Sequence, residues 1–376
     1  KNIAYLTLDQ SSVNRYRVTD HIPVRQTHEV YPYPKAGDPN PVVGICIDGK
    51  KLNLEPLGFE TPLISQVCWS PSNEVFFQIQ NRIQNVIKLV KWAPGDPSSQ
   101  VVVEETSPQG WLRSPGNPVW QNVNSKEFIW FTHRGGKRHI ATYRNDGALV
   151  ENGKGKTQRK DDALEVRSFE GLSEDAVYFT AAMATDATKI QLYRLGDTGD
   201  PVMITRPQFN HSIEFSPDLR YFFDTRSQTG TPSQTALMRS DGTFMRFIRP
   251  NLVDHLDYFD IVAPKYHRVP TRDGDQMDAM IIYPPDFDDS KKYPVIMHVY
   301  AGPQAPRVRK RWGGQSYLWH QMMAQRGFII WMCDNRSATY RGLDKTYPIY
   351  QDLGRRELAD IEDSLTWLKK QEGVDA

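Results

Sequence analysis

Tyr293-Pro-Val-Ile-Met-His-Val-Tyr-Ala-Gly-Pro303 is the stretch that decides the fold of the second part of this 376-residue sequence. Its near-continuous run of apolar and β-branched residues is typical of a buried parallel strand rather than of a half-exposed one. The run ends at Tyr300, where Ala-Gly-Pro predicts a turn out of the sheet. Ligands of open α/β sheets bind just beyond the carboxyl ends of strands. The Tyr300 hydroxyl and the small-residue turn therefore form a candidate catalytic edge.

The residues around this stretch have an α/β pattern. Arg272-Asp-Gly-Asp275 predicts a hairpin turn, and Phe328–Cys333 predicts a second buried strand. Helices are predicted over Ser316–Gln325 and Glu357–Gln371, the second with apolar residues at 3-4-3 spacing, acidic residues early and lysines late. We assign residues 263–376 to the beginning of an α/β domain that has too few strands to close its sheet.

Residues 1–262 instead contain short strands, turn clusters and aromatic residues, with weak internal repetition. Four units each place an aromatic residue before a polar turn, and an aromatic strand and a further strand follow. The marker aromatics are Trp69, Trp120, Phe169 and Phe215, spaced by 51, 49 and 46 residues. Several units end in polar turns, at Asn145-Asp-Gly147, Asp197-Thr-Gly199 and Asp241-Gly242.

A period of about 40 to 50 residues with several strands per unit is typical of propeller blades. We therefore predict a partial β-propeller over residues 1–262, with about five blades of which the first is incomplete. An irregular β-sandwich is the alternative, and the regular spacing argues against it.

Composition limits the classes of function. The hydrophobic fraction is 39%, the charged fraction is 24% and the net charge is +1, so nothing indicates a nucleic-acid partner or an anionic membrane surface. No window is long and apolar enough for a membrane segment. Three cysteines cannot form a disulfide framework, and the nine histidines lack metal-site spacing, so we expect neither metal nor cofactor. Lys1 begins within a strand pattern, so we expect an incomplete amino terminus, and the sequence does not indicate a compartment.

Three stretches give the sequence a resemblance to a known family. They are Tyr31-Pro-Tyr-Pro-Lys-Ala-Gly-Asp-Pro-Asn-Pro41, Lys292–Gln304, and Asp334-Asn-Arg336 with the later Glu357–Asp363. Together they resemble the prolyl oligopeptidase family of serine peptidases, in its dipeptidyl peptidase IV-like branch. The resemblance implies a β-propeller followed by an α/β-hydrolase domain. By position, Tyr300 matches the tyrosine whose hydroxyl stabilises the oxyanion in these enzymes.

The resemblance also implies residues that this sequence lacks. Such a hydrolase needs a Gly-x-Ser-x-Gly nucleophile elbow, followed in the chain by Asp and His. No such motif is present, and Gly314-Gln-Ser-Tyr-Leu318 lacks the last glycine. We therefore expect the hydrolase part to stop before its elbow and the chain alone to be inactive. His298, His320 and His255 are interpreted as strand or surface histidines, not as the catalytic base.

Family members bind the substrate amino terminus with a pair of adjacent glutamates. Glu104-Glu105 is an adjacent pair here, but it follows Val101-Val-Val and is interpreted as the end of a strand. It also comes after the Tyr31–Pro41 stretch, whereas the family order places the pair before it. We therefore expect that pair upstream of Lys1.

The leading hypothesis is a fragment of a serine exopeptidase that releases Xaa-Pro or Xaa-Ala dipeptides from peptide amino termini by acyl-enzyme hydrolysis. Its partners would be peptides with a free amino terminus, and the parent protein could be a homodimer. One alternative is another peptidase of the same family, either an acylaminoacyl peptidase or an endopeptidase. The other is a non-enzymatic propeller binding protein with a degenerate hydrolase domain.

Overall fold

The computed structural model describes residues 2–122, 124–150, 164–196 and 200–375. These residues form two compact units. The first comprises Lys1–Pro108, Leu112–Trp130 and Tyr143–Leu149, and the second Gln109–Trp111, Phe131–Thr142 and Val150–Ala376. This division differs from the predicted boundary near residue 262, which stays a prediction. The predicted turn at 197–199 lies outside the described residues.

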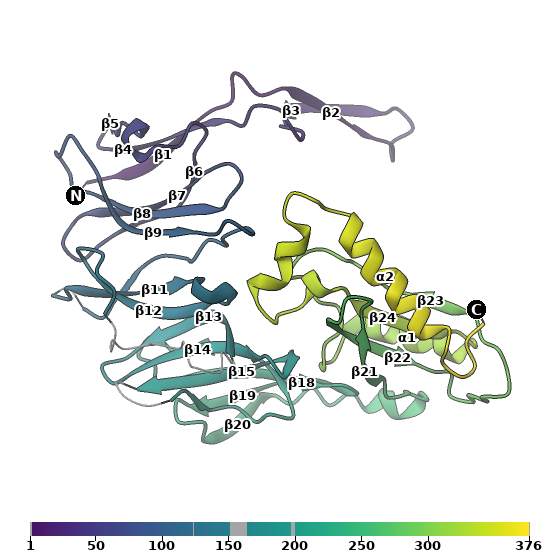
Figure 1. Ribbon diagram of the computed structural model, residues 1–376. Coiled ribbons are helices and arrows are strands. Elements are labelled where there is room, and N and C mark those ends of the chain that lie inside the picture. Colours follow the sequence, from purple (N-terminus) through teal and green to yellow (C-terminus); the bar gives the residue numbers. More distant parts are fainter. Residues whose placement is uncertain (1, 123, 151–163, 197–199, 376) are drawn as a thin grey trace. The chain divides into compact units, whose positions relative to one another are not determined.

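The first unit is built from antiparallel strands that follow one another in the chain (Figure 1). One three-stranded sheet has the order β1-β4-β5, and a separate hairpin consists of β2 and β3. The next sheet is a four-stranded meander, β6-β7-β8-β9. The bounds are β1 Ala4–Asp9, β2 Arg15–Asp20, β3 Thr27–Pro32, β4 Val42–Ile47, β5 Lys50–Lys51, β6 Leu63–Trp69, β7 Val75–Gln80, β8 Val86–Trp92 and β9 Gln100–Thr106, with a short 3-10 helix η1 at Glu55–Leu57.

The core of the first unit lies between two of these sheets. Phe77 and Ile79 of β7 are fully buried and belong to the same apolar cluster as Ile45 and Ile47 of β4. Alternate residues of a strand point to opposite faces, so one face of β7 packs toward the preceding sheet. Sheets that stack face to face in chain order are what consecutive propeller blades require.

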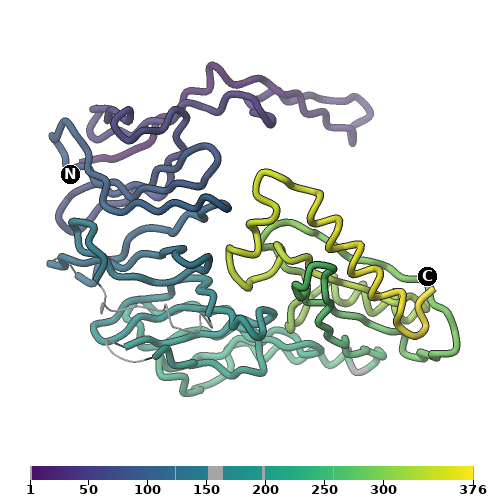
Figure 2. Tube along the Cα trace, viewed as in Figure 1, coloured from purple at the N-terminus to yellow at the C-terminus, as the bar shows by residue number. Residues whose placement is uncertain are grey.

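The later strands repeat the four-stranded pattern. A three-stranded sheet β10-β11-β12 precedes the meanders β13-β14-β15-β16 and β17-β18-β19-β20, which the trace in Figure 2 follows in chain order. The bounds are β10 Val119–Trp120, β11 Glu127–Thr132, β12 His139–Arg144, β13 Leu164–Leu172, β14 Ala176–Met183, β15 Asp186–Gly196, β16 Val202–Met203, β17 Asn210–Phe215, β18 Tyr221–Gln228, β19 Thr231–Arg239 and β20 Phe244–Arg249, with 3-10 helices η2 Arg134–Gly136 and η3 Asp254–Tyr258.

The repeat that the sequence predicts is confirmed at the level of single strands. Each of the marker aromatics Trp69, Trp120, Phe169 and Phe215 lies on the first strand of its sheet. Phe215 also packs against Tyr178 of the preceding sheet, with ring centroids 4.9 Å apart. One marker aromatic therefore lies on the first strand of each successive sheet. The region is propeller-like because it repeats small antiparallel sheets in chain order.

A mixed sheet of order β21-β22-β24-β23 completes the second unit, with β23 parallel to β24 and the other pairs antiparallel. Its hairpin turn contains Gly274 at φ +91°, as the sequence predicts. The bounds are β21 Lys265–Pro270, β22 Gln276–Ile282, β23 Val295–Met297, β24 Ile329–Asp334, α1 Gly314–Gln325 and α2 Arg355–Leu368, with 3-10 helices η4 Arg336–Ala338 and η5 Leu343–Ile349. None of the helices in the described ranges has the length and apolar character needed to cross a membrane.

The two α-helices cover opposite faces of the mixed sheet. Ile330 and Met332 of β24 share an apolar cluster with Tyr317 of α1, whereas Trp331 shares another with Leu368 of α2. Trp331 is fully buried and stacks on Trp367, with ring centroids 5.4 Å apart. An apolar strand covered on both faces is what the run Phe328–Cys333 predicts.

The opening strand differs from its prediction. Its parallel pairing is confirmed, but β23 spans only Val295–Met297 and is half-buried, so the expectation of a buried strand reaching Tyr300 is wrong. The reason is its edge position: within the described residues its outer side has a single parallel bridge, between Tyr293 and Val374. The N–H of His298 still donates to the carbonyl oxygen of Trp331 at 2.9 Å, and the backbone leaves the sheet after this bond.

Charged side chains join the mixed sheet to the hairpin between β14 and β15 within the second unit. Arg341 binds Asp278 of β22 through both carboxylate oxygens, at 2.7 and 2.9 Å, and also donates to the carbonyl oxygen of Ala184. Lys310 forms an ion pair of 2.9 Å with Asp186. The contacts to Ala184 and Asp186 connect residues 157 and 124 positions apart in the chain and join the sheet to the hairpin.

The turn at Gly147 offers a test of packing in the first unit. Gly147 has φ +94°, and an added Cβ would overlap the carbonyl oxygen of Val102. Gly95 has a similar φ of +86° with open space around it. We expect Gly95→Ala to cost about 1–2 kcal/mol of unfolding free energy, from left-handed strain alone. Gly147→Ala should cost more, because a backbone atom must also move. Urea unfolding of both variants measures this, and equal losses would contradict the contact.

Candidate active site

Tyr300 lies in an exposed turn beyond β23, with 58% of its surface accessible. The next residue, Ala301, has a left-handed φ of +63°, which folds the chain back. The ring of Tyr300 lies so close to Gly302 that a Cβ there would overlap it. The guanidinium of Arg307 lies over the same ring, 4.7 Å from its centroid. The ring is therefore contacted from its own turn, while more than half of the residue's surface stays accessible.

A buried carboxylate at the end of β24 fixes the segment that follows this turn. Asp334 accepts hydrogen bonds from the backbone N–H groups of Arg307 (2.8 Å) and Val308 (2.9 Å). Burial raises the pKa of Asp334 to about 7, and these two N–H groups oppose the rise. The N–H of Gln304 also donates to the carbonyl oxygen of Ser337, at 2.6 Å. The turn after Tyr300 is thus attached to β24 and the residues that follow it.

The arginine of the Asp334-Asn-Arg336 motif has a separate role. Its guanidinium binds Asp360 of α2, which is fully buried, at 2.7 Å, and Asp273 of the β21–β22 turn at 2.7 Å. The hydrogen bond from Arg336 is the main reason that the pKa of Asp273 lies well below its usual value. Arg336 therefore connects a helix, a hairpin turn and the end of β24.

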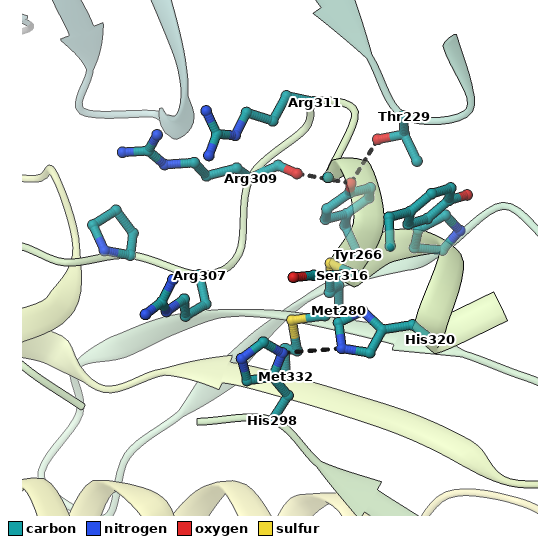
Figure 3. Close-up of a pocket in the computed structure, with 14 residues that line it drawn as sticks. Thr229, Tyr266, Met280, His298, Arg307, Arg309, Arg311, Ser316, His320 and Met332 are labelled. Atoms are coloured by element: carbon teal, nitrogen blue, oxygen red, sulfur yellow. Dashed lines mark hydrogen bonds between the residues drawn. The ribbon is translucent and has the colours of Figure 1, made fainter. Parts of the chain in front are cut away.

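A pocket of about 160 Å³ lies behind the turn, within the second unit (Figure 3). Its lining comes from the mixed sheet, from α1 and from the segment between Pro306 and Gly313. Tyr266 is one of the lining residues, and its hydroxyl lies 2.6 Å from the hydroxyl of Thr229. The lining residues are Thr229, Pro264, Tyr266, Met280, His298, Pro306, Arg307, Arg309, Arg311, Gly313, Ser316, Tyr317, His320 and Met332.

Two histidines of this pocket form a pair. Nδ1 of His298 lies 3.0 Å from Nε2 of His320, as Figure 3 shows. Burial, followed by the charge of Arg307, lowers the pKa of His298. Burial, followed by the charge of His298, lowers the pKa of His320 to about 4. Both rings are therefore neutral near pH 7, and one must donate to the other. The pair links the residue that follows β23 to helix α1, two positions before Tyr300.

Sequence reasoning treated these histidines separately and missed their pairing. His298 lies at the strand end, as expected, whereas His320 is buried on α1 rather than at the surface. The spacing in the predicted helix could have indicated its burial, because His320 lies on the same buried face of α1 as Tyr317 and Ala324. The third histidine, His255, is exposed on η3.

The Glu104-Glu105 pair is part of strand β9, as the sequence predicts. Glu104 is exposed and lies 3.5 Å from Lys88, whereas Glu105 is buried. Neighbouring residues of a strand point to opposite faces. The two carboxylates therefore cannot converge on one amino group, which agrees with the expectation that they are not the amine-binding pair.

The histidine pair predicts a pH dependence of stability. The folded-state pKa of His320, about 4, lies below the ordinary value of 6.5. Between these pH values the unfolded chain takes up a proton that the folded protein does not, so this contribution to stability falls as the pH falls from 6.5 to 4. We expect His320→Gln to flatten the decline of the urea midpoint over this range. An unchanged slope, with His21→Gln as the exposed control, would contradict the buried pair.

The Arg336 contacts predict a large loss of stability on substitution. Arg336→Gln leaves the buried Asp360 carboxylate without its charge partner, and we expect a loss of about 3–5 kcal/mol. Arg355→Gln removes an exposed ion pair with Asp352 at the start of α2, and should cost less than about 1 kcal/mol. Chemical denaturation of both variants measures the difference. Similar losses would show that burial of Asp360 is not decisive.

Comparisons with known proteins agree with this architecture. Residues 1–233 match the family model described as "Dipeptidyl peptidase IV (DPP IV) N-terminal region". A probable dipeptidyl peptidase 4 of Aspergillus flavus is 23% identical over 385 residues, covering 95% of this chain and 49% of that protein. A probable dipeptidyl-aminopeptidase B of Uncinocarpus reesii is 26% identical over 411 residues, covering 98% of this chain and 44% of that protein.

The crystal structure of Porphyromonas gingivalis dipeptidyl peptidase 4 superposes with a TM-score of 0.87 at 21% identity, over 100% of this chain and 53% of that one. This likeness concerns the fold. The chain spans about half the length of the curated relatives it matches. Because the family model covers more than half of the chain, this protein belongs to the dipeptidyl peptidase IV-like branch of the prolyl oligopeptidase family.

Proposed function

We propose that this chain is part of a serine exopeptidase that releases Xaa-Pro or Xaa-Ala dipeptides from peptide amino termini. Residues 1–262 form its partial propeller, and residues 263–376 form the first part of its α/β-hydrolase domain. The observation that carries the proposal is Tyr300, which is accessible beyond a parallel strand in a turn anchored by Asp334. The names of its relatives, dipeptidyl peptidase and dipeptidyl-aminopeptidase, support the reaction class.

Tyr300 acts as a hydrogen-bond donor to negative charge in this proposal. When a serine attacks the carbonyl carbon of the second residue, the carbonyl oxygen becomes an oxyanion. The Tyr300 hydroxyl donates to that oxygen together with a backbone N–H. Collapse of the intermediate breaks the C–N bond, the remaining peptide leaves as an amine that takes its proton from the histidine, and water hydrolyses the dipeptide ester left on the serine. The serine, its histidine base and the aspartate come from outside these 376 residues, where the longer relatives have further sequence.

A rigid turn suits this role. A donor is effective when it is already oriented toward the position of the charge and needs no rearrangement during the reaction. The close approach of the Tyr300 ring to Gly302 limits its rotation, and the cation of Arg307 lies over its face. These contacts leave the hydroxyl free to face a substrate.

The role of Tyr300 can be tested in the complete gene product with an Ala-Pro chromogenic substrate. Tyr300→Phe removes only the hydroxyl, and we expect kcat to fall about 10²- to 10³-fold with little change in thermal stability. Tyr258→Phe is the matched control, because Tyr258 is 82% exposed on η3.

Retention of the full rate by Tyr300→Phe would remove this tyrosine from the active site. Assays with amino-blocked peptides address the broader assignment. Cleavage of acetylated but not of free amino termini would identify an acylaminoacyl peptidase instead. A folded protein that reacts with no serine-directed probe would be a binding protein.

A further inference from the structure

Three arginines of the pocket form no ion pair within the described part of the chain. In the run Arg307-Val-Arg-Lys-Arg311, Lys310 pairs with Asp186, whereas no carboxylate of the described residues lies within ion-pair distance of Arg307, Arg309 or Arg311. The pocket lining contains no aspartate or glutamate. The nearest carboxylate is that of Asp334 outside the lining, whose pKa the charge of Arg309 lowers, so three guanidinium groups face one buried carboxylate. An excess of cations over counter-charge in a concave site favours an anionic ligand.

The side chains of the three arginines lie on one side of the pocket. Figure 3 shows those of Arg309 and Arg311 beside each other and that of Arg307 apart from them, nearer His298. Partial desolvation, followed by the charge of Arg309, lowers the pKa of Arg311, and Arg307 adds to this effect. Mutual repulsion of this kind is relieved when an anion binds between the groups.

Two of these arginines are held by aromatic rings. Arg307 lies over Tyr300, and Arg309 lies over Tyr340 at 4.8 Å from the ring centroid while donating to its hydroxyl. A guanidinium stacked on a ring keeps N–H donors in its own plane, where they can bind a carboxylate with two hydrogen bonds. The arginines are thus oriented before any ligand binds.

The position of the cluster indicates which part of a substrate it would contact. The guanidinium of Arg307 is only 4.7 Å from the centre of the Tyr300 ring. Each residue of an extended peptide spans about 3.3–3.6 Å, so a side chain one or two residues from the reacting carbonyl reaches the cluster. An enzyme that releases dipeptides has only two residues before the cleaved bond, and the rest of its substrate lies after it.

We propose that Arg307, Arg309 and Arg311 form a carboxylate subsite for the leaving peptide, which favours an acidic residue at the first or second position after the cleaved bond. This inference rests on the proposed function for its substrate, and on the arginine cluster for its specificity. It makes the arginines specificity-determining residues, and it assigns Lys310 a structural role.

The test compares Ala-Pro-Asp-Ala-Ala with Ala-Pro-Asn-Ala-Ala as substrates of the complete gene product, by chromatography of released Ala-Pro. We expect kcat/KM to be roughly three- to tenfold higher for the aspartate peptide, the range of a partly exposed charge-assisted contact. Arg311→Gln and Arg307→Gln should each bring this ratio toward one. Because the readout is a ratio, a lower fraction of folded protein does not affect it.

Two control variants change the same charge elsewhere. Arg326→Gln alters an exposed arginine after α1, and Lys310→Gln alters the paired cation of the same run. Both should keep the ratio of the unmodified protein. A ratio of one in the unmodified protein, with both peptides cleaved, would overturn the subsite and leave the peptidase function intact. The subsite would also be overturned if the enzyme preferred an acidic residue only at the first position of the released dipeptide and not after the cleaved bond.

Binding provides an arm that does not depend on cleavage. Asp-Ala-Ala should bind this chain more tightly than Asn-Ala-Ala in calorimetry, and Arg311→Gln should abolish the difference. Inorganic phosphate should displace Asp-Ala-Ala, because it competes for the same donors. Equal binding of the two tripeptides would overturn the proposal even for a protein that cleaves nothing. Binding of phosphate without any binding of Asp-Ala-Ala would assign the cluster to a free anion and overturn its role in substrate selection.

Discussion

The hydrogen bonds of Asp334 are the interaction on which the geometry of the candidate site depends. Two backbone N–H groups, from Arg307 and Val308, donate to a carboxylate that is buried at the end of β24. A buried charge is tolerated only when its oxygens are satisfied, so the segment that supplies these donors has little freedom to move. The turn of Tyr300 on one side and the arginine run on the other both take their positions from this attachment.

Arg336 extends the same network to the helix and the hairpin. Its partners Asp360 and Asp273 come from elements that are far apart in the sequence and meet only in the folded chain. The short motif Asp334-Asn-Arg336 thus combines two tasks, with the aspartate binding a loop and the arginine binding α2 and the β21–β22 turn. The planar guanidinium of Arg336 can bind two carboxylates at once, a geometry that a lysine would not reproduce.

Much of the fold could be predicted from the sequence because its signals are local. The marker aromatics, the turn at Gly274 and helix α2 follow from periodicity and turn chemistry within a few residues. The extent of β23 could not be predicted, since burial of a strand depends on how many neighbours it acquires in the sheet. An apolar run looks the same in sequence whether it is central or at an edge.

The site was predictable only in part, for a similar reason. Tyr300 was singled out because the residues around it resemble a family motif, and its role stays a prediction. The pairing of His298 with His320 depends on a strand end meeting one face of α1, which no spacing rule gives. The arginine run was visible in the sequence, but the distinction between paired Lys310 and its unpaired neighbours requires the position of Asp186.

The contacts of Arg341 have a mechanical consequence. Separating the mixed sheet from the β14–β15 hairpin would break the hydrogen bond from Arg341 to the carbonyl oxygen of Ala184 and the ion pair between Lys310 and Asp186, while Arg341 would keep its two hydrogen bonds to Asp278. The bidentate contact with Asp278 fixes the plane of the Arg341 guanidinium, so its remaining donor is oriented toward Ala184 without further ordering of the side chain.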